Sequence, residues 1–336
     1  MIAIRQFPFN RILLVSGVLG ALALSGCAGA PAVLSPASPN AAMVANLFFI
    51  LFAIAVVVFV VVESLLFYSV IRFRRKQTDG MPAQIHGNPK LEIVWTAIPA
   101  VVLAIVFVLT WQTLNSLAAV PPNAMNIKVT GYQWWWQVEY PDLGIVTANE
   151  MHVPAGQDVL FTLESNDVIH SFWVPELGGK MDMIPGHTNR LWLRPTKIGV
   201  YQGQCAEFCG TAHALMRFTV SVEPAEQFNA WVAQQKQPAQ MPTAELAKRG
   251  ADEIVEAGCQ GCHTINGTKA QGKSGPDLTH LASRKMIAAG MLALSEENLH
   301  AWINDPSAVK PGTKMPKLGL TREQIDAISA YLLTLK

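Results

Sequence analysis

Apolar residues cluster in three runs near the N-terminus, and the rest of the chain alternates more finely between apolar and polar positions. The first run, residues 12–24, is too short to cross a bilayer. Residues 42–71 and 93–117 contain much longer apolar stretches, which suit a hydrocarbon core of roughly 30 Å at 1.5 Å per residue. The pattern therefore predicts transmembrane helices over 42–71 and 93–117, joined by a loop over 72–92.

The middle of the chain has a different pattern, with short alternating or β-rich segments at 126–140, 158–164, 189–193 and 216–222. Turn residues such as those of Pro154 to Gly156 separate them. Short, regularly spaced strands predict an all-β sandwich, which we place over residues 123–224. The run 131–136 is expected to form one strand, with Trp134 and Trp136 facing one way and Trp135 the other.

The last third of the chain is predicted to be all-α. Residues 226–235 favour a terminal helix after the sandwich, and the Gln- and Pro-rich stretch 234–242 favours a flexible linker, so that 225–242 connects two domains. Residues 244–336 form the final domain. Its last helix is expected over 321–335, where Thr321 and Gln324 have the spacing of a capping box.

Composition and charge agree with a membrane protein. The hydrophobic fraction is 51% and the charged fraction 15%, which is too apolar for an ordinary soluble chain. The net charge of +1 and the absence of a basic stripe argue against nucleic-acid binding. The loop between the two predicted spans is strongly basic: Arg72, Arg74, Arg75, Lys76 and Lys90. The positive-inside rule places this loop in the cytoplasm and both outer ends on the external face.

The N-terminus has the features of a secretory signal. Residues 1–11 carry Arg5 and Arg11 without an acidic residue, and the short apolar run that follows ends in Ser25-Gly26-Cys27. The sequence Leu24 to Cys27 resembles the lipobox of bacterial lipoproteins. The resemblance implies that residues 1–26 are removed, that Cys27 is lipidated, and that residues 27–41 form a tether. The alternative is an ordinary signal with an incidental cysteine.

A copper-binding pattern lies between residues 205 and 216. Cys205, Cys209, His213 and Met216 place two thiols, an imidazole and a thioether within twelve residues, which is a set of soft copper ligands. A second cysteine allows two sulfurs to bridge two metal ions, and each ion then needs its own imidazole. His170 is the best candidate for the second. The alternative is a Cys205–Cys209 disulfide in an oxidising compartment.

A haem-binding pattern follows in Cys259-Gln260-Gly261-Cys262-His263, the attachment motif of a c-type haem. A zinc site would need a second ligand pair. The distal iron ligand must be a methionine or a histidine. We favour Met315, because prolines on both sides make its loop rigid. The rival ligands are Met286, Met291, His280 and His300.

The context of His170 and the Cys205–Met216 loop closely resemble subunit II of the haem–copper cytochrome c oxidases. The resemblance implies that the sandwich is cupredoxin-like and that a dinuclear copper A centre is bound by His170, Cys205, Glu207, Cys209, His213 and Met216. Glu207 would bind through its backbone carbonyl, and its carboxylate would reach a Mg or Mn ion shared with subunit I. All six positions match, unlike those of quinol-oxidase relatives that have lost the copper.

The same resemblance implies further roles. Trp134 would be the exposed residue through which electrons enter copper A. Glu92 would be the mouth of a proton channel into subunit I, although an acid that caps the helix N-terminus explains it equally well. Asp182 also matches the family, but we assign it no role.

The resemblance covers residues 42–223, and residues 245–336 resemble class I cytochromes c. Together they resemble the fused subunit II of caa3-type oxidases, in the prokaryotic inner membrane. This implies a proton-pumping terminal oxidase in which cytochrome c passes electrons through haem c and copper A to the haem of subunit I, where O2 is reduced to water. Subunit I and the other oxidase subunits would be partners. The alternatives are a copper-A nitric oxide reductase subunit and a membrane-anchored copper carrier.

Overall fold

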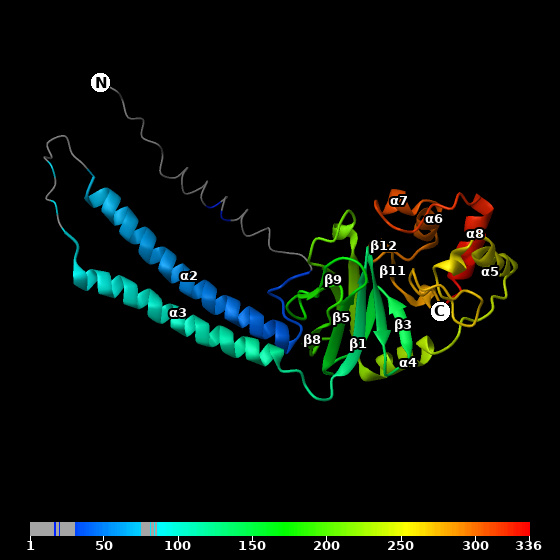
Figure 1. Cartoon of the computed structure of the whole chain (residues 1–336), viewed down its shortest axis with the longest axis horizontal. Helices are drawn as coiled ribbons and strands as arrows, with labels where there is room; N and C mark the ends of the chain where they lie inside the picture. Colours follow the sequence, from blue (N-terminus) through cyan, green and yellow to red (C-terminus); the bar gives the residue numbers. More distant parts are fainter. Residues whose placement is uncertain (1–16, 18–19, 21–30, 75–80, 82–83, 85) are drawn as a thin grey trace, which may run out of the picture.

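The computed structural model of the chain describes residues 17, 20, 31–74, 81, 84 and 86–336. A pair of long helices, a β-sandwich and a smaller helical domain follow one another along the chain (Figure 1). Cys27 and almost all of the predicted signal lie outside the described residues. The cleavage and the lipidation of this segment therefore stay predictions.

The two long helices are α2 (Pro39–Arg72) and α3 (Pro89–Ala118), which run side by side away from the sandwich (Figure 1). Ser38 caps α2 by accepting a hydrogen bond from the Ala41 N–H, and Asn88 caps α3 in the same way. Both helices are long and apolar enough to cross a membrane. Most of their apolar side chains are exposed, which suits contact with lipid or other membrane subunits.

The outer ends of both helices are bound to the sandwich. The indole N–H of Trp192 donates to the Leu117 carbonyl at the end of α3, at 2.7 Å. At the start of α2, the Asn40 side chain donates to the Trp192 carbonyl at 3.1 Å and accepts from the Arg194 N–H at 3.0 Å. The segment before α2, expected to be a tether, is also fixed against the sandwich over its last residues, where the Ala37 N–H donates to the Glu176 carbonyl at 2.8 Å.

The sandwich consists of two five-stranded sheets. The first has the order β3-β2-β1-β5-β8: Ile145–Ala148, Trp135–Tyr140, Met125–Tyr132, Val159–Ser165 and Asn189–Leu193. The second has the order β4-β10-β9-β6-β7: Glu150–Pro154, Arg217–Glu223, Gly199–Cys205, His170–Trp173 and Met181–Met183. The pairs β1–β5 and β4–β10 are parallel, and the others are antiparallel.

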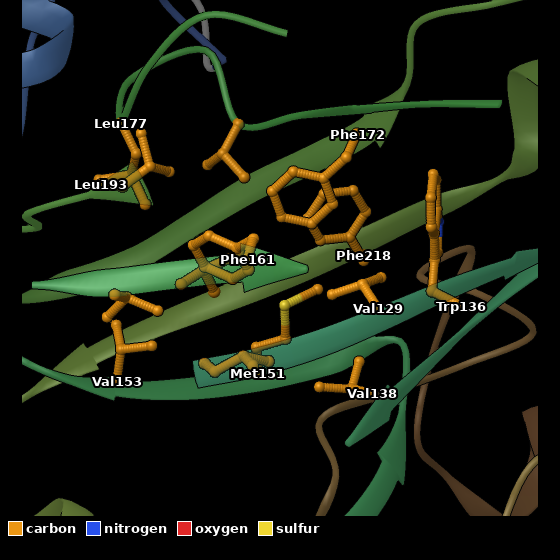
Figure 2. Packing of buried hydrophobic residues seen from close by; sticks show 14 of the residues in the cluster. Val129, Trp136, Val138, Met151, Val153, Phe161, Phe172, Leu177, Leu193 and Phe218 are labelled. Carbon is orange, nitrogen blue, oxygen red and sulfur yellow. The ribbon is translucent and has the colours of Figure 1, made fainter. Parts of the chain in front are cut away.

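The core between the sheets is rich in aromatic side chains (Figure 2). Phe172 stacks on Phe218 with their ring centroids 4.7 Å apart, and Phe161 packs on Phe172 at 5.0 Å. Trp136 is fully buried beside them, and its ring lies 6.0 Å from that of His170. The aromatic core thus extends to His170 and holds this side chain in place.

The three consecutive tryptophans do not share a strand, so this prediction was wrong. β1 ends at Tyr132 and β2 begins at Trp135, and the chain turns between them at Gln133 and Trp134. Trp135 stacks on Tyr132 at 4.7 Å. Because Trp134 lies in the turn, its side chain can extend beyond the end of the sheet.

The C-terminal domain is mainly helical. It contains α5 (Glu245–Glu256), α6 (Glu296–Asn304), α7 (Pro306–Val309) and α8 (Arg322–Leu332), with short 3-10 turns at Cys259–Gly261 and Leu281–Ser283. The predicted capping box of Thr321 and Gln324 is confirmed. Gly250 lets α5 approach α8 closely, since a Cβ there would lie 1.9 Å from the Ala327 carbonyl oxygen. A small hairpin pairs β11 (Met286–Ile287) with β12 (Leu292–Ala293).

The segment between the two domains is held in place. Helix α4 (Ala225–Gln235) packs on the sandwich, where Trp231 stacks on His152 with the ring centroids 4.5 Å apart. The Gln234 side chain donates to Ser283 at 3.1 Å, and the Ala239 N–H donates to the Asn266 carbonyl at 2.9 Å. The linker predicted over 234–242 therefore contacts the C-terminal domain at Gln234 and Ala239, and its flexibility stays a prediction.

Candidate metal and haem sites

Strand pairing brings the predicted copper ligands to one end of the second sheet. Cys205 is the last residue of β9, and Met216 directly precedes β10, which pairs with β9. His170 is the first residue of β6, the other neighbour of β9. The loop between Cys205 and Met216 folds back over this end and carries a 3-10 turn that begins at His213.

The side chains form a compact cluster of sulfur and nitrogen atoms. The two thiol sulfurs lie 3.8 Å apart. The Cys205 sulfur is 3.9 Å from Nδ1 of His170, and the Cys209 sulfur is 3.6 Å from Nδ1 of His213 and 3.9 Å from the Met216 sulfur. Each thiol thus has an imidazole of its own, which fits a pair of soft metal ions bridged by two sulfurs.

Both thiols of the cluster are free and buried, so the alternative of a disulfide is not borne out. Their separation is far beyond the roughly 2.05 Å of a sulfur–sulfur bond. Contact between the sulfurs lowers the pKa of Cys205 to about 3 and raises that of Cys209, because one thiolate accepts the remaining proton. A thiolate is the form that binds metal ions.

Glu207 presents two different groups. Its backbone carbonyl oxygen lies 3.2 Å from the Cys205 sulfur and so faces the cluster. Its carboxylate is 45% exposed and 4.0 Å from the Lys180 amine. The carbonyl can therefore act as a ligand while the carboxylate remains accessible to a neighbouring molecule.

Asp167 supports the cluster and was not singled out from the sequence. Its carboxylate lies 2.8 Å from Nε2 of His170, which leaves Nδ1 free for a metal ion, as is usual for metal-binding histidines. Burial raises the pKa of Asp167, but hydrogen bonds from His170 and the Gln133 N–H outweigh it and keep this pKa below its usual range. The signal available in the sequence was the position of this aspartate, three residues before the candidate ligand His170.

A cavity of about 680 Å³ surrounds the predicted haem-attachment motif. Cys259, Cys262 and His263 line it. Nδ1 of His263 is 2.7 Å from the Pro276 carbonyl, which leaves Nε2 for iron. Gly275 keeps the space beside this ring open, since a Cβ there would lie 2.8 Å from Cε1 of His263. The donor set and the space fit a covalently attached haem.

Arg284 gives a further test of this fit and was also not singled out from the sequence. Its guanidinium lines the cavity and donates to the Asp277 carbonyl at 2.5 Å. Its Nε is buried and has no hydrogen-bond partner among the described residues. A buried unpaired donor is costly, and haem carries two carboxylates that can accept from it.

The residues that line the cavity reduce the number of candidates for the distal iron ligand. Among the described lining residues are Met315 and Met286, but not Met291, His280 or His300. His280 lies instead between the carbonyls of Gln235 and Lys336, at 3.1 and 2.9 Å. Met315 therefore remains the proposed ligand, with Met286 as its rival.

We expect Met315→Leu to abolish the weak sulfur-to-iron absorption band of the ferric protein and to lower the haem potential, because a thioether favours ferrous iron. Optical redox titration of the full chain measures both effects. Met286→Leu is the matched control, since both methionines line the cavity. Loss of the band in Met286→Leu, with Met315→Leu unchanged, would assign the ligand to Met286.

Trp134 lies between the two sites. Its indole N–H donates to the Cys209 carbonyl at 3.0 Å, and the Gln133 side chain donates to the same carbonyl at 2.8 Å. Trp134 also lines the haem cavity. One side chain thus contacts the copper-type cluster and borders the haem-type cavity.

Two other residues singled out from the sequence do not contact either site with their side chains: Glu92, and Asp182, which pairs with Ser171 beside His170. Glu92 is exposed in the first turn of α3, where a carboxylate is favoured by the helix dipole. Asp182 lies on β7, and its backbone carbonyl accepts a hydrogen bond from the Asn189 side chain at 2.8 Å. The structure adds no role for either side chain.

Three family descriptions match the chain: the transmembrane domain of cytochrome c oxidase subunit II at residues 32–112, its periplasmic domain at 144–223, and cytochrome c at 247–336. Cytochrome c oxidase subunit 2 of Alkalihalophilus pseudofirmus is 39% identical, and the match covers 94% of each chain. The chain belongs to the cytochrome c oxidase subunit 2 family. It is therefore part of an oxidoreductase complex and has a periplasmic domain on a membrane anchor.

Two further proteins are similar to this chain. Cytochrome c oxidase subunit 2 of Bacillus sp. is 41% identical over 79% of this chain and 80% of its own length. The crystallised periplasmic domain of subunit II of the Bradyrhizobium japonicum oxidase is 35% identical and covers 35% of this chain and 97% of its own, with a TM-score of 0.34. Membership implies copper A and haem c as cofactors, and the other oxidase subunits and cytochrome c as partners.

Proposed function

We propose that this subunit takes electrons from cytochrome c at its haem domain and passes them through Trp134 to the copper loop, and from there to subunit I. Haem c and copper A would supply one-electron carriers. Oxygen is reduced to water in subunit I, in an oxidase that pumps protons. The observation that carries the proposal is the position of Trp134, which borders the haem cavity and donates to the carbonyl of a copper-loop cysteine.

The proposed ligands are the residues of the copper-binding pattern and of the haem-binding pattern in the sequence. Copper A would be held by the side chains of His170, Cys205, Cys209, His213 and Met216 and by the carbonyl of Glu207. Haem c would be attached at Cys259 and Cys262, with His263 and Met315 as axial ligands. The short distances between the sulfur and nitrogen atoms support the first set, and the shared cavity supports the second.

Other proposals rest on fewer observations. The exposed Glu207 carboxylate is proposed to reach a Mg or Mn ion shared with subunit I, and Glu92 to form the mouth of its proton channel. Contacts between the haem domain and the sandwich support a periplasmic location for the C-terminal part. Lipidation of Cys27 remains a proposal from the sequence. The names of the relatives favour an oxidase over a nitric oxide reductase, and a copper carrier would not need the haem motif.

Replacing His263 with alanine tests the path, because it is expected to remove haem binding. Reduction of copper A by external cytochrome c should then slow by about a hundredfold or more, since electrons lose their positioned carrier. Stopped-flow absorption of the purified oxidase measures this rate. His300→Ala is the control, because His300 is not among the described residues that line the haem cavity and pairs with Asp326 within the haem domain at 3.4 Å. An unchanged rate in His263→Ala would place the haem domain off the main path.

A further inference from the structure

The haem domain and the sandwich are joined by hydrogen bonds from segments far apart in sequence. Three of them run from the Arg217 N–H to the Ala289 carbonyl at 3.0 Å, from the Lys285 N–H to the Glu150 carboxylate at 3.1 Å, and from the Lys310 amine to the Trp134 carbonyl at 2.7 Å. Two of them use backbone N–H groups, whose positions depend on the fold of each domain. The contact therefore requires one particular alignment of the two domains.

Lys310 is the most buried charged residue of this contact, with only 2% of its surface exposed. Its amine donates to the carbonyl of Trp134, in the sandwich, and to that of Ala288, in the haem domain, at 3.2 Å. Burial lowers the pKa of Lys310 to about 7. A buried amine is costly unless it is hydrogen-bonded, so the docked pose must keep both carbonyls within reach of Lys310.

The position of Lys310 links the two sites. Lys310 donates to the Trp134 carbonyl, and Trp134 in turn donates its indole N–H to the Cys209 carbonyl. Two residues later, Gly312 lies against the same indole, since a Cβ there would be 3.4 Å from Cη2 of Trp134. The loop then continues to Met315 in the haem cavity. A displacement of Lys310 would therefore separate Trp134 from the loop that carries the proposed distal ligand.

We propose that Lys310 is a positioning residue that holds the haem domain in one fixed pose over Trp134. The haem domain then does not search for its docking site on a mobile tether. This inference rests on the proposed function, because electron transfer between the two sites is what a fixed pose would serve.

The test compares Lys310→Met with wild type in the purified oxidase. Methionine keeps the length and the apolar stem of lysine but cannot donate to either carbonyl. We expect transfer from haem c to copper A, followed by flash photolysis, to slow by about tenfold or more. Hydrogen exchange at the Arg217 amide should accelerate, because this N–H is bonded across the contact. The haem absorption bands should not change, which separates loss of position from damage to the haem site.

Lys317→Met is the matched control, since Lys317 is exposed and pairs with Asp305 inside the haem domain at 2.7 Å. It should leave both the transfer rate and Arg217 exchange unchanged. If Lys310→Met also leaves both unchanged, Lys310 does not position the domain and the inference is wrong. If wild-type haem c never reduces copper A, the proposed function fails, whereas Arg217 exchange still reports whether Lys310 holds the domains together.

A measurement on wild type alone covers the case in which Lys310→Met does not fold. Buried contacts are screened by salt much less than exposed charges. The internal transfer rate should therefore be the same at low and high ionic strength. A rate that changes strongly with salt would indicate a domain that docks and undocks, and would overturn the fixed pose.

Discussion

Replacing Cys209 with serine is expected to convert the proposed copper pair into a site for a single ion. The two sulfurs lie 3.8 Å apart and would bridge the pair, and each has its own imidazole. A serine hydroxyl is a hard, weakly acidic ligand and does not replace a bridging thiolate. The multi-line mixed-valence EPR signal of the full chain should give way to the hyperfine pattern of one copper nucleus.

Glu207→Gln is the control for this variant in the same loop. It removes the exposed carboxylate but keeps the backbone carbonyl that lies 3.2 Å from the Cys205 sulfur. Its copper content and EPR signal should match those of wild type. A mixed-valence signal that survives in Cys209→Ser would exclude a bridging role for this thiol, and metal analysis would show whether a pair of ions is still bound.

Trp134→Phe is expected to slow electron transfer from the haem domain to copper A by about a hundredfold, while reduction of the haem by external cytochrome c stays fast. Phenylalanine lacks the indole N–H that donates to the Cys209 carbonyl at 3.0 Å, so the ring loses the contact that holds it against the copper loop. Stopped-flow absorption, followed at haem and copper wavelengths, separates the two steps.

Trp231→Phe is the matched control for Trp134→Phe. Trp231 lies on α4 and stacks on His152, and a phenylalanine can keep this aromatic contact. Both electron-transfer steps should have wild-type rates in Trp231→Phe. If Trp134→Phe also has wild-type rates, electrons reach copper A by a route that does not include the indole.

The sequence by itself determined the residue chemistry of both sites. The spacing from Cys205 to Met216 and the motif from Cys259 to His263 are local, and their ligand preferences follow from the side chains alone. The apolar runs likewise indicated the two long helices, because membrane spans depend on length and composition. These features need no knowledge of which segments meet in space.

Only the tertiary structure decided how the sites are supported and joined. The turn at Trp134 depends on the register of β1 and β2, which alternation over 131–136 could not reveal. Arg284 and Lys310 resemble ordinary surface cations in the sequence, and their burial depends on packing around the cavity and between the two domains. A Gln- and Pro-rich linker indicates local flexibility, whereas contacts from distant segments determine whether the domains it connects are docked.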